Sequence, residues 1–406
     1  MSAKVGSYNV NGKRFHNKLQ AILYANESKA DVTWDFYKNI LDICDWTVEP
    51  AVSLLTLYAE RAKQIREEYD YVILMCSGGA DSTNVLYSFL DNGVKIDEII
   101  AGAPLEGLKN WNVDSTNTSV TEMASETMLA QIPLLNKVAQ SHPDVKLTIN
   151  DYFNDMVNLK PDELIYKNSS QWLHWSAHAR YSLDKFKHLR ELAESGKKIG
   201  IVYGTDKPII CRSTSGNLFT VLNDAAVMGP TQSFKDDYDN VEIVLFYYTP
   251  DLPELMIKQA HDLCRFLYNP ENCYAKSTLW DLSKSDKFND SNHRRTEYQR
   301  AIVPCIYPTI EHAKGTVWQS DKAGSGLKGG LEIDAWMYKL HPNHRVVTAL
   351  ESELNSFMSL LDNKYKQFAN GTPGIVRFTN YWRIGHESSF APEVTTDNII
   401  INTEMK

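Results

Sequence analysis

The sequence has little cysteine and no long apolar run. Its six cysteines are scattered over 406 residues, and no two of them form a Cys-x-x-Cys pair. This spacing argues against a disulfide framework and fits reduced, mostly buried thiols. No apolar stretch approaches the length of a membrane span, and the N-terminus lacks the apolar region of a signal peptide. These absences predict a cytoplasmic protein with no membrane partner.

No charge of one sign dominates the chain either. It carries 42 Lys and Arg against 51 Asp and Glu, a formal net charge of −9, and both signs are mixed along the sequence. This balance gives no general electrostatic case for nucleic-acid binding, although a local basic patch stays open. The length allows a large core, in two domains or in one α/β domain with extensions.

The strongest local signal lies at residues 71–90. Residues 71–76 form a continuous apolar run that suits a buried strand, and apolar residues recur at helical spacing over 85–90. A glycine-containing loop between a strand and a helix lets an anion approach the backbone, where the unpaired N–H groups and the dipole of the helix favour it. The loop consists of Ser77, Gly78, Gly79, Ala80, Asp81 and Ser82.

Asp81 is the unusual member of this loop. A carboxylate repels a bare phosphate, so its position suggests a divalent cation that bridges carboxylate and phosphate. The loop lacks the Gly-Lys-Ser/Thr ending of a Walker motif and does not match Gly-x-Gly-x-x-Gly. The competing interpretation is a tight turn that uses Ser and Gly for geometry alone.

The SGGADS loop, in its strand–turn–helix setting, resembles the PP-loop of the ATP pyrophosphatases, also called adenine nucleotide alpha hydrolases. Over most of its length the chain also looks like PP-loop, PAPS-reductase-like proteins of large tailed bacteriophages. The resemblance implies an α/β fold: a Rossmann-like (HUP-type) parallel sheet with helices on both faces. It also implies that ATP and Mg²⁺ bind, that a substrate oxygen is adenylated with release of pyrophosphate, and that a second nucleophile displaces AMP.

The resemblance also implies roles for particular residues. The loop would cradle the pyrophosphate, small residues after the second strand would pack against adenine, and the turn at 205–208 would lie beside nucleotide and substrate. An ordinary sheet-rim turn is an equally open interpretation of 205–208. The implied nucleotide-binding residues are Ser77 to Ser82, Ala103, Gly204 and Thr205; the implied metal ligands are Asp81 and Asp206; and the implied catalytic residues are Asp81, Lys207 and Arg212.

The sequence pattern predicts three regions. Residues 1–70 are expected to form an N-terminal helical extension, 71–250 the PP-loop domain, and 251–406 a C-terminal α+β region for substrate binding or oligomerisation. The alternation of strands and helices over 71–250 favours a parallel sheet. We expect strands at 71–76, 97–103, 145–149, 199–204, 241–248 and 376–384, and helices at 52–69, 122–140, 171–194, 255–268 and 350–368.

Other polar clusters give weaker signals. His174 and His178 would share a helix face but lack a third metal ligand, and the Cys and His residues over 261–312 fit no standard metal pattern. The basic stretch 291–300 is more typical of a solvated loop than of a nucleic-acid contact. The glycine-rich stretch 323–330 suits either a connector or a mobile loop near the substrate.

The sequence leaves the second chemical step open. We favour an amidation-type ligase, with ammonia taken from solution or from a donor protein; a sulfur donor protein is the thiolation counterpart. The alternatives are a nucleotide-binding interaction protein without turnover and a PAPS-reductase-like sulfonucleotide-binding protein, which would need Cys211 or Cys305 exposed near the loop. Whether the substrate is a small molecule or a nucleic acid, and whether the chain forms a homo-oligomer, stays open.

Overall fold

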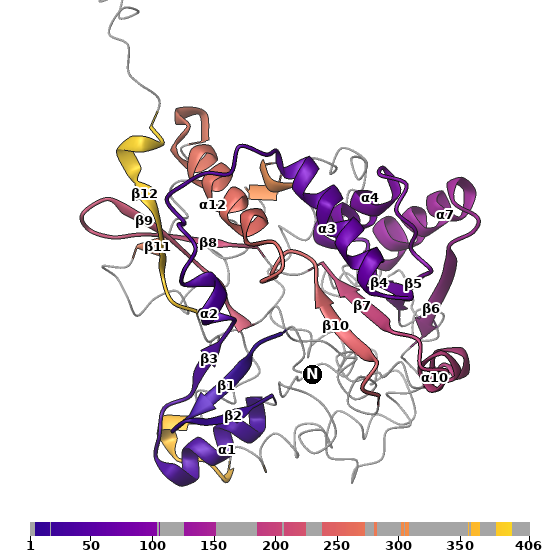
Figure 1. The fold of residues 1–406 in the computed structure, drawn as a ribbon, viewed down its shortest axis with the longest axis horizontal. Helices are drawn as coiled ribbons and strands as arrows, with labels where there is room; N and C mark the ends of the chain where they lie inside the picture. Colours follow the sequence, from indigo (N-terminus) through magenta and orange to yellow (C-terminus); the bar gives the residue numbers. More distant parts are fainter. Residues whose placement is uncertain are drawn as a thin grey trace, which may run out of the picture.

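The computed structural model describes most of the chain between residues 5 and 272 and several shorter pieces after it (Figure 1). Its described residues form three sheets: one of three strands, one of five and one of four. Within those residues, no helix has the length and apolar character needed to cross a bilayer. The described ranges are 5–16, 18–103, 105, 126–151, 185–204, 207–224, 238–272, 280–281, 302–303, 305–307, 356, 359–365 and 379–391.

The five-stranded sheet is entirely parallel and has the order β10-β7-β4-β5-β6. The chain enters at the central strand β4, moves outward through β5 to β6, and then crosses back to β7 and β10 on the other side. The order therefore reverses between β4 and β7, and in open α/β sheets such a reversal places a crevice at the carboxyl ends of the strands. The strands are β4 (Tyr71–Met75), β5 (Glu98–Ala103), β6 (Lys146–Asp151), β7 (Ile199–Tyr203) and β10 (Val241–Leu245).

Helices cover both faces of this sheet. Val72 and Leu74 of β4 point into one core with α3, α4 and α7, whereas Ile73 and Met75 point into a second core with α10. This alternation follows from the two-residue period of a strand. The predicted α/β fold with a parallel sheet and helices is thus confirmed. The helices are α3 (Leu54–Glu68), α4 (Ala80–Leu90), α7 (Ile132–Ser141) and α10 (Lys187–Glu194), and a π-helical turn η1 (Glu126–Gln131) leads into α7.

The N-terminal region is helical only in part, which corrects the expectation for residues 1–70. It contains an antiparallel sheet in the order β2-β1-β3 beside α1 and α2. Asn11 and Gly12 connect β1 to β2 with φ of +50° and +79°, the left-handed backbone of a two-residue hairpin turn. The elements are β1 (Ser7–Val10), β2 (Lys13–Phe15), α1 (Lys18–Ser28), β3 (Thr33–Asp35) and α2 (Lys38–Leu41).

A four-stranded sheet follows β7 in the chain, in the order β11-β8-β9-β12. The β8–β9 hairpin was not predicted, and β12 lies slightly later than the expected strand at 376–384. Helix α12 packs on α3 and against this sheet, as Figure 1 shows. The elements are β8 (Ile209–Arg212), β9 (Asn217–Val221), β11 (Trp280–Asp281), β12 (Trp382–His386), α12 (Pro253–Tyr268) and the 3-10 turns η4 (Pro270–Asn272) and η9 (Glu387–Ser389).

Candidate nucleotide-binding site

The SGGADS loop joins β4 to α4 in a compact turn. Gly78 has a φ of +78°, a backbone conformation that favours glycine, and Gly79 caps the helix in an extended conformation. The Ser77 hydroxyl accepts the N–H of Gly79 at 3.3 Å and lies 3.3 Å from the hydroxyl of Ser82. The polar groups of the loop therefore hold it in the shape that leads into the first turn of α4.

Helix α4 presents unpaired donors at this end. Its internal hydrogen bonding starts with the N–H of Thr83, which donates to the Gly79 carbonyl at 2.9 Å. The N–H groups of Ala80, Asp81 and Ser82 consequently have no partner within the helix. Ser77 at the edge of the turn is exposed. Together with the helix dipole, this end of α4 is suited to an anion.

Asp81 and Lys207 form an ion pair across the reversal in strand order. The ammonium of Lys207, which follows β7, lies 2.5 Å and 2.8 Å from the two carboxylate oxygens of Asp81 in the first turn of α4. The Lys207 side chain is 8% exposed and that of Asp81 30%. Both residues were predicted from the sequence to belong to the site, although they lie 126 positions apart in the chain. The structure brings them together at the place where such folds bind ligands.

Two buried tyrosines after β10 fix the backbone on either side of this pair. Tyr247 donates to the Asp81 carbonyl at 2.8 Å, and Tyr248 donates to the Lys207 carbonyl at 2.9 Å. Asn84 in turn donates to the Tyr247 hydroxyl at 3.0 Å. Neither tyrosine was predicted as a site residue, because both continue the apolar run of the preceding strand. Their position beyond the last strand of the sheet was the available signal.

The C-terminal region also reaches the site, through Tyr307. The Lys207 ammonium lies 5.6 Å from the centre of the Tyr307 ring, which packs against Tyr247 at 5.2 Å. Burial and the negative charge of Asp81 raise the pKa of Tyr307 well above its usual value. Tyr58 of α3 holds the neighbouring backbone by donating to the Ile306 carbonyl at 2.6 Å. No motif or spacing in the sequence indicates this contact.

Gly204 lies at the end of β7 against the first turn of α4. A Cβ atom at this position would stand 2.8 Å from the Asp81 carbonyl oxygen, so glycine allows the strand and the helix to approach each other. Gly204 was expected to bind the nucleotide; in the structure its neighbour is the loop helix. The next two predicted site residues, Thr205 and Asp206, lie outside the described residues.

Gln131 closes the loop from the β5 side. Its amide group donates to the carbonyls of Cys76 and Gly102, at 3.1 Å and 3.2 Å, and so bridges the ends of β4 and β5. Its main chain covers Gly78, where a Cβ atom would lie 2.7 Å from the Gln131 Cα. Ala103, the predicted adenine contact, ends β5 and is buried. Gln131 was not identified from the sequence.

Arg212 is the last residue of β8, in the four-stranded sheet. Its guanidinium holds the carboxylate of Glu387 through two hydrogen bonds of 2.7 Å and 2.8 Å, and Tyr268 donates to the same carboxylate at 3.0 Å. The hydrogen bond to Glu387 raises the pKa of Arg212. The structure therefore places Arg212 in a fork that ties β8 to η9, whereas it brings Asp81 and Lys207 together.

The cysteines of the described region are poorly suited to thiol chemistry. Burial raises the pKa of Cys76 and of Cys211, and it raises the pKa of Cys305 to about 12. The Cys305 thiol donates to the Asp262 carbonyl at 3.3 Å. Because the thiolate is the reactive form, these environments leave little nucleophile at neutral pH. Cys273 lies outside the described residues.

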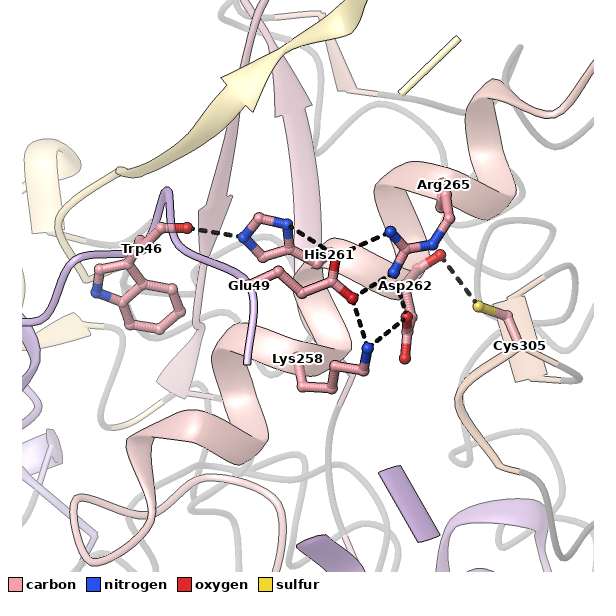
Figure 2. Close-up of polar contacts among 7 residues, drawn as sticks. All are labelled: Trp46, Glu49, Lys258, His261, Asp262, Arg265 and Cys305. Carbon is pink, nitrogen blue, oxygen red and sulfur yellow. Dashed lines mark hydrogen bonds and ion pairs between the residues drawn. The ribbon is translucent and has the colours of Figure 1, made fainter. Parts of the chain in front are cut away.

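A second polar cluster fastens α12 to the segment before α3 (Figure 2). Glu49 lies 2.5 Å from both the Lys258 ammonium and the Arg265 guanidinium, and these hydrogen bonds, Arg265 foremost, lower its pKa to about 2. His261 contacts the Trp46 carbonyl at 3.0 Å, and burial lowers its pKa. Since the charges neutralise one another, we interpret this cluster as a structural clamp.

The described residues contain no group of three or more His, Cys, Asp and Glu side chains placed to hold a metal ion. The remaining sequence candidates lie outside the described residues: His174, His178, the basic stretch 291–300 and the glycine-rich stretch 323–330. Comparison of the chain with protein-family models, with curated proteins and with solved structures gives no match.

Proposed function

We propose that the chain binds ATP with Mg²⁺ at the SGGADS loop and adenylates a substrate oxygen, with release of pyrophosphate. The observation that carries this proposal is the Asp81–Lys207 ion pair. It places one anion and one cation at the N-terminal end of α4, at the reversal in strand order. Phosphates with a bound metal need both kinds of partner, and few purely structural turns would gather them here.

Each charge in the site has a task in this proposal. The N–H groups of the first α4 turn and the Ser77 hydroxyl hold phosphate oxygens, and Lys207 exchanges Asp81 for a phosphate. Asp81 would then be available to hold the metal. The exchange keeps every charge paired, so it avoids the large cost of a lone charge in a half-buried site.

The residues present fit Mg²⁺ in particular. This ion is usually held by one or two carboxylates together with phosphate oxygens and water, so a cluster of protein ligands is not required. When bound, Mg²⁺ supplies positive charge that stabilises the departing pyrophosphate. Asp81 would be the residue that holds the metal, and the N–H groups of the first α4 turn would stabilise negative charge on the phosphates.

For the second step we favour a nitrogen nucleophile that displaces AMP, as in an amidation-type ligase. The buried thiols described above favour nitrogen over sulfur carried on this chain. The reductase-like alternative needs an exposed thiol near the loop, and burial of Cys211 together with the raised pKa of Cys305 weighs against it.

A nucleotide-binding protein without turnover is the second candidate. The observation that favours it is that Lys207, nearly buried, contacts both oxygens of Asp81. If that pair persists when the nucleotide binds, Asp81 cannot hold a metal, and the loop would grip phosphate without chemistry. The two candidates therefore differ in whether the ion pair opens.

The test compares wild type with Asp81→Asn, and uses Asp91→Asn as the matched control. Asp91 lies at the other end of α4 and is exposed, so the control removes the same charge from the same helix. Release of AMP and pyrophosphate from ATP is measured with Mg²⁺, across fractions of small metabolites and of tRNA. ATP binding is measured in parallel by calorimetry, with and without EDTA.

We expect substrate-dependent pyrophosphate release in wild type and in Asp91→Asn, and its loss in Asp81→Asn. Binding of ATP that is unaffected by EDTA, with no release in any fraction, would instead establish the binding protein. Absence of ATP binding altogether would refute the assignment of the loop.

A further inference from the structure

Three buried tyrosines lie close enough to Asp81 for its charge to act on them. Burial, together with the negative charge of Asp81, raises the pKa of Tyr58, Tyr247 and Tyr307. Tyr58 donates to the Ile306 carbonyl at 2.6 Å, and Tyr247 donates to the Asp81 carbonyl at 2.8 Å. The Tyr307 hydroxyl, by contrast, is enclosed and has no hydrogen-bond partner in the described part of the chain.

An unpaired buried hydroxyl calls for an explanation. Tyrosine hydroxyls usually find a partner when they are buried, because losing water without gaining a hydrogen bond is unfavourable. A phenylalanine would fill the same space without this cost. The hydroxyl of Tyr307 therefore points to a partner that becomes available in another state of the protein.

One oxygen of Asp81 is the matching acceptor. Its Oδ1 is enclosed and accepts no hydrogen bond of suitable angle, although it lies 2.5 Å from the ammonium of Lys207 in the ion pair. The Asp81 side chain as a whole is 30% exposed, so another part of it stays accessible. The same ammonium lies 5.6 Å from the centre of the Tyr307 ring. Asp81 thus has a charged donor that contacts it and a neutral one nearby that does not.

The Tyr307 side chain is held in place by its surroundings. Its ring packs on that of Tyr247 at 5.2 Å, and its N–H donates to the Val303 carbonyl at 3.0 Å. The carbonyl of the preceding residue accepts from Tyr58, to which Gln259 in turn donates at 2.9 Å. The hydroxyl of Tyr307 is therefore positioned before any ligand binds.

We propose that Tyr307 is a positioning residue, whose hydroxyl donates to the Asp81 carboxylate when Lys207 turns to a phosphate. Without this donor, the exchange would leave the enclosed oxygen of Asp81 unpaired. A carboxylate that holds a metal is itself usually held by a further hydrogen bond. This inference rests on the proposed function, because it requires the Asp81–Lys207 pair to open when the nucleotide binds. It adds a residue of the C-terminal region that acts on the carboxylate and not on the nucleotide.

The first test measures the stability of the free protein. Tyr307→Phe removes the hydroxyl and keeps the ring. Tyr69→Phe is the matched control, because Tyr69 is also buried and its hydroxyl donates to a carboxylate, that of Glu242, at 2.6 Å. In urea unfolding without nucleotide, Tyr307→Phe should have a midpoint at or above that of wild type, whereas Tyr69→Phe should have a lower one.

The second test measures binding of ATP with Mg²⁺ by calorimetry. Loss of a hydrogen bond to a charged group should weaken binding to Tyr307→Phe by roughly 10–150-fold. Tyr69→Phe should bind within about twofold of wild type, because its hydroxyl lies at a distant, independent site. In an Asp81→Ala background the acceptor is absent, so Tyr307→Phe should change the affinity by no more than about twofold.

The outcomes separate the two proposals. Wild-type affinity for ATP in Tyr307→Phe would overturn the role of Tyr307 and leave the proposed function intact. A Tyr307→Phe midpoint as low as that of Tyr69→Phe, or a failure to fold, would do the same, because the hydroxyl would then already serve the free protein. An undiminished effect of Tyr307→Phe in the Asp81→Ala background would also overturn it. Absence of ATP binding by wild type would overturn both proposals.

Discussion

Gly78→Ala is the substitution that tests the architecture of the candidate site most directly. Two costs arise from the structure. An alanine at φ +78° loses about 1–2 kcal/mol because its Cβ crowds the following carbonyl. That Cβ would also stand 2.7 Å from two main-chain atoms of Gln131, and overpacking of this kind costs about 1–3 kcal/mol. Gln131 cannot shift cheaply, because its amide is tied to β4 and β5.

Gly93→Ala provides the control for this prediction. Gly93 follows α4 with φ +62° and has no atom within 4 Å of an added Cβ, so it carries the first cost without the second. Urea unfolding should therefore show Gly78→Ala less stable than Gly93→Ala by about 1–3 kcal/mol, seen as a lower midpoint at equal slope. Equal midpoints would mean that the Gln131 backbone does not press on the loop.

Three further predictions concern the rest of the chain. Lys18→Met should lower the free energy of unfolding by about 3–5 kcal/mol, because Lys18 and Asp224 form a 2.6 Å pair with side chains 1% and 0% exposed; urea unfolding at pH 7 measures this, and a loss below 1 kcal/mol would contradict it. The pKa of Glu49 falls from 4.5 to about 2 on folding. The stability of wild type relative to Glu49→Gln is therefore complete above pH 5 and is lost as the pH drops toward 2. After allowance for solvent screening we expect a difference of about 1–2 kcal/mol at pH 7, and a difference independent of pH would refute this prediction. Cys305, with a pKa near 12, should react with iodoacetamide at pH 8 at least about tenfold more slowly than after unfolding in urea, as peptide mass spectrometry would show.

The parallel sheet was predictable because its strands are buried on both faces. Such strands read as continuous apolar runs, and β4, β5 and β7 all carry one. Their alternation with helices then favours parallel pairing. The order of strands was not predictable in the same way, because it depends on contacts between segments far apart in the chain.

Two kinds of feature escaped the sequence analysis. The β1–β2 hairpin had a local signal, Asn11-Gly12, that went unused. The pairing of Arg212 with Glu387, 175 positions away, had none. Asp81 and Lys207 could be nominated because each follows a strand, whereas Gln131 acts through a helix that merely crosses the strand ends. A residue that contacts the site from a separate helix, as Gln131 does, is not part of any local sequence motif.

The contact of Tyr307 with Asp81 and Lys207 has a consequence for the order in which the protein is made. The loop leaves the ribosome early, but the ring that packs against its ion pair is synthesised more than two hundred residues later. At about 5–20 residues per second, roughly 10–45 seconds separate the two events. The sheet can form during that interval, before the Tyr307 ring packs beside Lys207. A chain that ends before Ile306 would carry the loop motif but would lack the Ile306 carbonyl that accepts from Tyr58 and the Tyr307 ring beside Lys207.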